Sequence, residues 1–124
     1  MGLDFSHGNV YFPYHGFQIF RCKLAIEAGI PDLDAMDGYG HGLFPDPKEQ
    51  LITWDSIPYD PIHLLLDHSD CEGELSSEEC QAVAPRLRVL IAPWPDNDRY
   101  RIAGYKLAAA MDEAAAANES LEFL

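Results

Sequence analysis

The segment His-Ser-Asp-Cys-Glu-Gly-Glu-Leu-Ser-Ser-Glu-Glu, residues 68–79, carries the side chains best suited to chemistry in this chain of 124 residues. It lies within residues 49–85, a stretch of 37 residues with nine carboxylates and no Lys or Arg. Carboxylates gathered in this way must be solvated, paired with cations or bound to a metal, because burying an unpaired charge is prohibitively costly. The segment therefore predicts either a surface for a basic partner or a cation site.

The same segment resembles the twelve-residue calcium loop of the EF-hand proteins. That loop places oxygen ligands at fixed positions, a glycine at position 6 and an acidic residue at position 12. Gly73 falls at position 6, and Leu75 is the apolar residue expected at position 8. The resemblance implies a divalent-cation site formed by Asp70, Glu72, Ser76 and Glu79. The chain departs from the family at position 1, where it has His68 instead of aspartate, and imidazole suits calcium poorly.

Three further interpretations of the segment compete with the calcium loop. It can be an acidic connector in which Gly73 makes the turn and Ser76 caps the next helix. It can belong to a transition-metal site, because His63, His68, Asp70, Cys71 and Cys80 include every type of zinc ligand, although their spacing is not that of a zinc knuckle. It can be part of a small hydrolase that uses His68 and Asp70. The sequence leaves open whether the protein is an enzyme, and the lack of a nucleophile elbow or phosphate-binding loop favours a protein that is not.

The charge balance of the whole chain favours a protein that binds a basic surface of a partner protein. The chain has 21 acidic and 8 basic residues, a net charge of −13, which repels nucleic acid and anionic membranes. We expect a small acidic regulatory protein that binds its partner through residues 49–85. Its sharpest form is an inhibitor that presents carboxylates as nucleic acid presents phosphates. The expected partner-binding residues are Asp67, Asp70, Glu72, Glu74, Glu78 and Trp94.

Composition indicates one globular domain over residues 1–124. A hydrophobic content of 48% supports a core. No apolar run reaches the roughly 18 residues of a membrane span, and the start of the chain lacks the basic and apolar regions of a signal peptide. We therefore expect a cytoplasmic protein. Its three cysteines, an odd number, predict reduced thiols rather than disulfides.

In the first half of the chain, aromatic and β-branched residues predict two short strands, Gly2–Phe5 and Asn9–Phe12, around a turn. Apolar residues at helical spacing predict a helix over His15–Ala28, with Gly29 just beyond its end. Residues 31–50 are rich in Gly and Pro and predict an ordered loop with one helical turn near Leu33–Met36. A short strand is expected at Leu51–Trp54.

The second half predicts three helices. Asp60 and Pro61 form a start signal for a short helix over Pro61–Asp67. Ser76 and Glu79 form a capping box for the next helix, which Pro85 should kink or shorten. A last helix is expected over Asn97–Ala117, capped by Asp96 or Asn97. The alternating tail of residues 121–124 can add an edge strand to the N-terminal hairpin. The sequence thus predicts an α+β fold with about four helices and a small antiparallel sheet.

Three parts of the chain also resemble a group of small uncharacterised proteins of actinobacteria and their phages. They are His-Ser-Asp-Cys-Glu-Gly-Glu-Leu at 68–75, Cys-x-x-x-Ala-Pro-Arg-Leu at 80–87 and Leu-Glu-Phe-Leu at 121–124. The resemblance covers most of the chain after Phe17. It implies no particular activity and agrees with a cytoplasmic, single-domain accessory protein.

Overall fold

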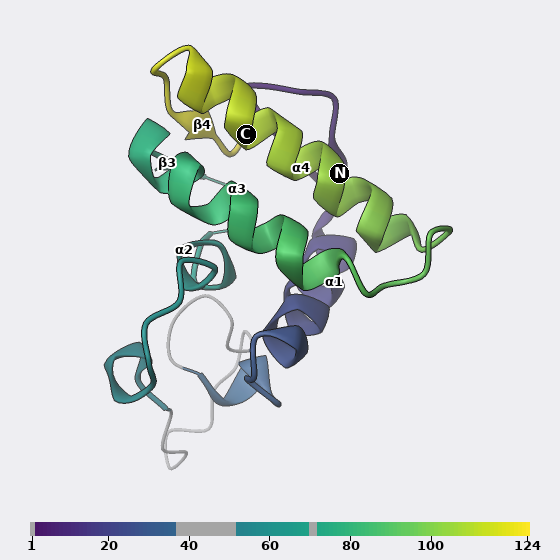
Figure 1. Cartoon of the computed structure of the whole chain (residues 1–124), viewed down its shortest axis with the longest axis vertical. Coiled ribbons are helices and arrows are strands. Elements are labelled where there is room, and N and C mark those ends of the chain that lie inside the picture. Colours follow the sequence, from purple (N-terminus) through teal and green to yellow (C-terminus); the bar gives the residue numbers. More distant parts are fainter. Residues whose placement is uncertain (1, 37–51, 70–71) are drawn as a thin grey trace.

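The computed structural model describes residues 2–36, 52–69 and 72–124, and in these ranges it confirms an α+β fold. Two long helices, α3 (Ser77–Ile91) and α4 (Arg99–Ala116), lie side by side, and α1 (Tyr14–Glu27) packs against them (Figure 1). Gly104 makes this packing close, since a Cβ there would lie 2.8 Å from Ile91 Cδ1 and 3.2 Å from a ring carbon of Phe20.

The N-terminal third agrees with the sequence prediction. Strands β1 (Gly2–Asp4) and β2 (Tyr11–Pro13) form an antiparallel pair, and β2 leads directly into α1. Gly29 follows α1 with φ +89°, a conformation that favours glycine, as expected of a residue just after a helix. The predicted helical turn is the 3-10 helix η1 (Leu33–Ala35). Residues 37–50 of the predicted loop lie outside the described residues.

The middle of the chain differs from the prediction in two places. The expected strand at 51–54 is wrong at Trp54, which begins the 3-10 helix η2 (Trp54–Ser56), while Ile52 makes one isolated bridge to Met36. Residue 51 lies outside the described residues. Helix α2 (His63–Leu66) is shorter than Pro61–Asp67 because its first residues form a turn. The Asp60 side chain still accepts from the Ile62 N–H at 3.1 Å.

The starts of the two long helices are set by side-chain caps. Ser76 and Glu79 form the predicted capping box at the start of α3. Helix α3 runs through Pro85 without interruption, so the predicted shortening is wrong, because its buried stripe holds one face across the proline. Helix α4 is capped by Asp98 rather than Asp96 or Asn97, with its carboxylate accepting from the N–H of Tyr100 at 2.8 Å and of Arg101 at 3.2 Å.

The C-terminal tail joins two distant parts of the chain. Strand β4 (Leu121–Glu122) pairs with β3 (Glu74–Leu75), which the sequence analysis did not predict. The next residue, Phe123, forms an antiparallel bridge with Phe5 at the end of β1, so the predicted contact with the N-terminal hairpin is also present. The tail therefore lies between the hairpin and the loop before α3.

Aromatic rings make up much of the core. Phe12 lies 5.3 Å from Phe17 and 4.9 Å from Phe20 between ring centroids, and Phe5 lies 4.9 Å from Phe123. All five rings are buried, and they tie the hairpin, α1 and the tail together. No helix in the described part of the chain is long and apolar enough to cross a bilayer.

Candidate functional site

The acidic stretch of the sequence surrounds two adjoining hollows, which we call the acidic groove. The larger hollow has a volume of about 500 Å³ and lies between the η2–α2 region and the start of α3. The smaller one, about 450 Å³, lies along the loop from Asp67 to Glu74. The carboxylates that line the groove are Asp55, Asp67, Glu72, Glu74 and Glu79. No Lys or Arg is among the described residues that line either hollow.

One wall of the groove is aromatic. The rings of Trp54 and His63 lie 4.9 Å apart, and Tyr59 meets His63 edge-on at 6.3 Å. Tyr59 is 74% exposed, so most of its surface is open to a partner. Burial lowers the pKa of His63, and the nearby Asp60 carboxylate opposes this only in part. Burial therefore favours the neutral form of the His63 ring.

An ion pair holds α2 against α3 behind the groove. Arg86 on α3 donates to both carboxylate oxygens of Asp60, with the Nη2–Oδ2 distance at 2.9 Å. Burial alone would raise the pKa of Asp60, but the hydrogen bonds from Arg86 and from the Ile62 N–H outweigh it and lower that pKa. The pair thus fixes the aromatic wall and leaves neither charge available to the groove.

A buried arginine positions the other end of α2. Arg21 on α1 is only 2% exposed, and its guanidinium donates to the backbone carbonyl oxygens of His68 at 2.5 Å and Leu66 at 3.4 Å. Its Nη2 also donates to the side chain of Gln18 at 2.6 Å. These bonds satisfy the carbonyl groups of Leu66, the last residue of α2, and of His68 two residues further on.

The His68 ring has a structural role in the groove. Nδ1 lies 2.9 Å from the Ser69 carbonyl oxygen and Nε2 lies 3.1 Å from the Glu74 carbonyl oxygen. The ring stacks on Phe123 with 3.8 Å between centroids. Because each nitrogen faces a backbone carbonyl, neither is presented to a metal ion or a substrate in the way the zinc and hydrolase interpretations require.

The loop from 68 to 79 has the predicted turn and cap. Gly73 has φ +92°, and its carbonyl oxygen accepts from the Phe123 N–H at 2.9 Å. Ser76 Oγ accepts from the Glu79 N–H at 3.1 Å, and Glu79 Oε1 accepts from the Ser76 N–H at 2.8 Å. Two of the four expected metal ligands therefore bond to each other's backbone, which confirms the structural roles of Gly73 and Ser76.

The rest of the expected metal set is less informative. Asp70 and Cys71 lie outside the described residues, and Glu72 is exposed. Within the described ranges, no three His, Cys, Asp or Glu side chains are placed to hold a metal ion together. Cys80 is fully buried and its thiol donates to the Leu75 carbonyl oxygen at 3.8 Å, while burial raises its pKa. It is a core thiol.

The expected partner-binding residues divide into two groups. Glu72, Glu74 and Glu78 are exposed and Asp67 is half-buried along the groove. Trp94 is only 7% exposed, so the prediction that it binds a partner is wrong: its ring is not accessible. Its indole N–H donates to Glu27 at 3.1 Å and its ring meets Phe20 at 6.2 Å, because the turn between α3 and α4 inserts it into the core over α1.

Sequence reasoning missed three residues that shape the groove: Asp55, Trp54 and Tyr59. The signal was present, because two aromatic residues flank an isolated aspartate just before a helix start, with no basic residue nearby.

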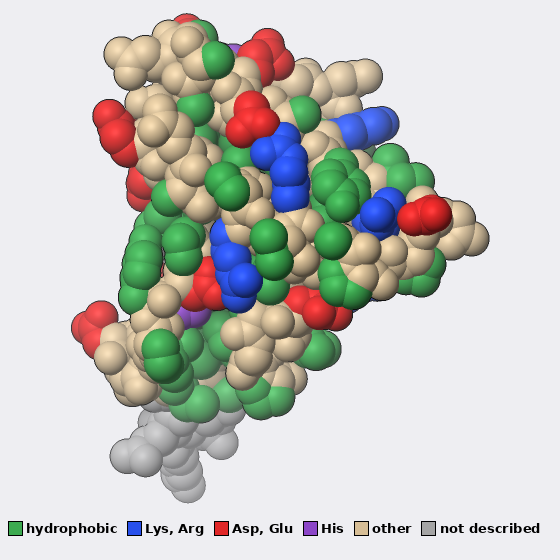
Figure 2. All heavy atoms as spheres, viewed as in Figure 1, with side chains coloured by type: hydrophobic (Ala, Val, Ile, Leu, Met, Phe, Trp, Pro, Cys, Tyr) green, Lys and Arg blue, Asp and Glu red, His purple; other side chains and the backbone are tan. Residues whose placement is uncertain are grey.

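Figure 2 shows basic and acidic side chains lying next to one another over α3 and α4, whereas acidic side chains along the left edge lie apart from any base.

No protein-family model, no curated protein and no solved structure matches this chain.

Proposed function

We propose that this protein is a small acidic interaction protein that binds a basic surface of a partner protein through the acidic groove. The observation that carries the proposal is a concave surface lined by five carboxylates and two large aromatic rings, with no Lys or Arg among the described residues that line it. Such a surface attracts cationic side chains and speeds their encounter with it.

The distribution of basic residues supports this proposal. Four of the eight Lys and Arg residues pair with carboxylates outside the groove: Lys23 with Asp98, Arg86 with Asp60, Arg88 with Asp112 and Arg101 with Asp96. A fifth, Arg21, is buried against backbone carbonyls. These residues are therefore not available to neutralise Asp55, Glu72 and Glu74.

The lining favours arginine or lysine side chains that lie along an aromatic ring. A guanidinium or ammonium group over Tyr59 or Trp54 gains a cation–π interaction, and a neighbouring carboxylate can accept its hydrogen bonds. Arginine fits best, since its planar group can stack on a ring and bond to a carboxylate together. The proposed partner is thus a surface or segment in which arginines are prominent.

As a regulator, the protein would act as an inhibitor. It would cover a basic surface with which the partner otherwise binds another anion, such as nucleic acid. We place this activity in the cytoplasm, in keeping with the resemblance to accessory proteins of actinobacteria and their phages. Competition between this protein and DNA for the same partner would test this form.

A nine-residue arginine peptide is a suitable probe of the groove. In one variant, Asp55→Asn, Glu72→Gln and Glu74→Gln remove three groove charges. In a matched control, Asp96→Asn, Glu113→Gln and Glu119→Gln remove three exposed charges elsewhere. At low salt, we expect the groove variant to bind the peptide at least tenfold more weakly than the parent, mostly because association is slower. The affinity of the control variant for the peptide should differ from that of the parent by about twofold or less.

Equal weakening in the two variants would show that net charge alone attracts the peptide, and it would overturn the proposal. So would unchanged association kinetics in the groove variant. Melting temperatures of both variants should stay close to that of the parent, because exposed charges contribute little to stability.

A further inference from the structure

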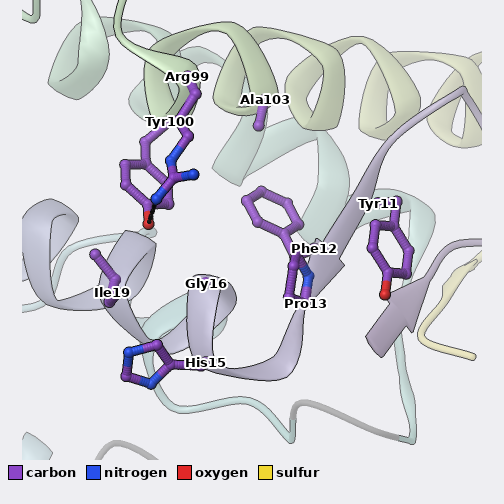
Figure 3. A pocket seen from close by; sticks show the side chains of 9 residues that line it. All are labelled: Tyr11, Phe12, Pro13, His15, Gly16, Ile19, Arg99, Tyr100 and Ala103. Atoms are coloured by element: carbon purple, nitrogen blue, oxygen red, sulfur yellow. Dashed lines mark hydrogen bonds between the residues drawn. The ribbon is translucent and has the colours of Figure 1, made fainter. Parts of the chain in front are cut away.

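A second concave site lies away from the acidic groove, between β2, the first turns of α1 and the first turns of α4. Its volume is about 310 Å³, at the small end of ligand pockets in proteins, which run from roughly 300 to 1,000 Å³. Figure 3 shows Arg99 and Tyr100 on one side, Ile19 and Gly16 of α1 on another, and Phe12 with Pro13 on the third.

The walls of this cavity are mostly apolar. Phe12 forms its floor and is 2% exposed, while Ile19 and Ala103 are half-buried beside it. Gly16 leaves room in the wall, since a Cβ there would meet nothing closer than Pro13 Cδ at 3.4 Å. No described Asp or Glu lines the cavity, which is unusual for a chain of net charge −13.

The guanidinium group of Arg99 lies at one side of this apolar cavity. The Arg99 guanidinium lies over the Tyr100 ring at 5.1 Å, and its Nη2 lies 3.3 Å from the Tyr100 hydroxyl oxygen. Lys106 lies two turns further along α4, about 10 Å along the axis, and lines an adjoining hollow of about 430 Å³ that shares Arg99 and Ala103 with the cavity. Asp4 is the one carboxylate among the described residues of that hollow.

Arg99 and Lys106 differ from the other basic residues of the described chain. Arg21 is bonded to backbone carbonyls, and Lys23, Arg86, Arg88 and Arg101 are each paired with a carboxylate. Neither Arg99 nor Lys106 forms an ion pair with any residue in the described ranges, and both are exposed. An acidic protein thus keeps two cations without an ion pair in the described ranges beside a mostly apolar hollow.

We propose that this cavity binds an amphipathic carboxylate, with the hydrocarbon chain against Phe12, Ile19 and Ala103 and the carboxylate held by Arg99. Arginine binds a carboxylate with two parallel hydrogen bonds, and the Tyr100 hydroxyl is close enough to donate a third. Lys106 attracts the same charge from the adjoining hollow. The apolar walls select for the chain, and the available cations select for the anionic head over neutral or cationic ones.

Decanoate is the probe, followed by amide shifts in two-dimensional NMR of the isotope-labelled protein. We expect added decanoate to shift the amide signals of Gly16, Arg99 and Ala103 until the site is saturated. Affinity should rise about threefold to fourfold for each added methylene from hexanoate upward, until the cavity is filled. Decanol and decyltrimethylammonium should each bind at least tenfold more weakly than decanoate.

Two variants that fill the cavity test the site. Gly16→Leu should abolish binding and still fold, because its Cβ has space and leucine suits a helix better than glycine. Ala103→Leu fills it from α4 and gives a second, independent test. Arg99→Gln should weaken the binding of decanoate about tenfold or more. Arg88→Gln, which also removes one positive charge but from α3, should leave the affinity for decanoate unchanged.

Decanoate shifts spread over the molecule would overturn the proposed site. The same holds if both filled variants, shown to be folded by their melting transitions, bind decanoate as tightly as the parent. Equal binding of decanol would overturn the role of Arg99. The arginine peptide used for the acidic groove should bind Gly16→Leu normally, which keeps the two sites distinguishable.

Discussion

The guanidinium of Arg21 on α1 donates a hydrogen bond of 2.5 Å to the backbone carbonyl oxygen of His68, 47 residues further along the chain. The bond is short and partly buried, and Arg21 also donates to the buried Leu66 carbonyl oxygen at 3.4 Å. One core arginine thus fixes where the end of α2 meets the acidic loop. The position of the groove therefore depends on a residue of α1 that does not line it.

Replacing Arg21 with methionine should destabilise the fold. The buried Leu66 carbonyl and the partly buried His68 carbonyl would lose their donor, and a buried unsatisfied group costs about 1–3 kcal/mol. Urea unfolding measures the change, and Arg88→Gln on the surface should cost less than about 1 kcal/mol. A native-like free energy of unfolding in Arg21→Met would contradict this account of the α2 junction.

Gly73→Val should lower stability by about 1–3 kcal/mol, because φ +92° is strained for a β-branched residue. Asp70→Asn should cost less, since it changes a charge and not the backbone requirement. Thermal unfolding of both variants checks the order. If millimolar calcium instead raised the melting temperature by several degrees, and Glu79→Gln removed that rise, the loop would be a cation site and the structural interpretation would fail.

The pair between Asp60 and Arg86 should stabilise the protein at neutral pH and lose its effect in acid. The pKa of Asp60 is lowered in the folded state, so its contribution is complete above the unfolded value of about 3.8 and is lost as pH falls below it through the folded pKa. A double-mutant cycle with Asp60→Asn and Arg86→Gln should give a coupling of about 1 kcal/mol at pH 7. A coupling that stayed constant down to pH 2 would contradict this prediction.

Leu107→Ala should cost about 2–5 kcal/mol, the usual range for truncating a core leucine. Leu107 is fully buried on α4, and α4 packs along α3. The exposed Ile102 on the same helix, at 45% exposure, is the matched control, and Ile102→Ala should cost less than about 1 kcal/mol. Denaturant unfolding separates the two. Similar values at both positions would mean that α4 contributes less to the core than its burial indicates.

Local signals predicted much of the fold. The capping box at Ser76 and Glu79, the glycine after α1 and the apolar stripe of α4 each depend on neighbours in sequence, so their outcome could be derived without tertiary structure. The cap of α4 was misplaced by one or two residues, because Asp96, Asn97 and Asp98 are all good caps and only the chain path selects Asp98.

The groove was predicted only in part. The charge gap from 49 to 85 indicated most of its carboxylates, although Asp55 was not singled out. Its aromatic wall depends on how η2 folds back toward α2, nine residues away, through a segment without regular structure. Trp94 shows the same limit, because two flanking prolines indicate a turn but not whether the ring points inward. The cavity beside Arg99 combines β2, α1 and α4, and no local pattern could bring those three together.

The bridge between Phe5 and Phe123 also has a consequence for the order in which this protein folds. During synthesis the hairpin of β1 and β2 leaves the ribosome first, but its neighbour Phe123 emerges 118 residues later. Until then Phe5 lacks one of its ring contacts and His68 lacks the ring on which it stacks. We therefore expect the nascent chain to keep part of its aromatic core open until β4 and Phe123 have been synthesised.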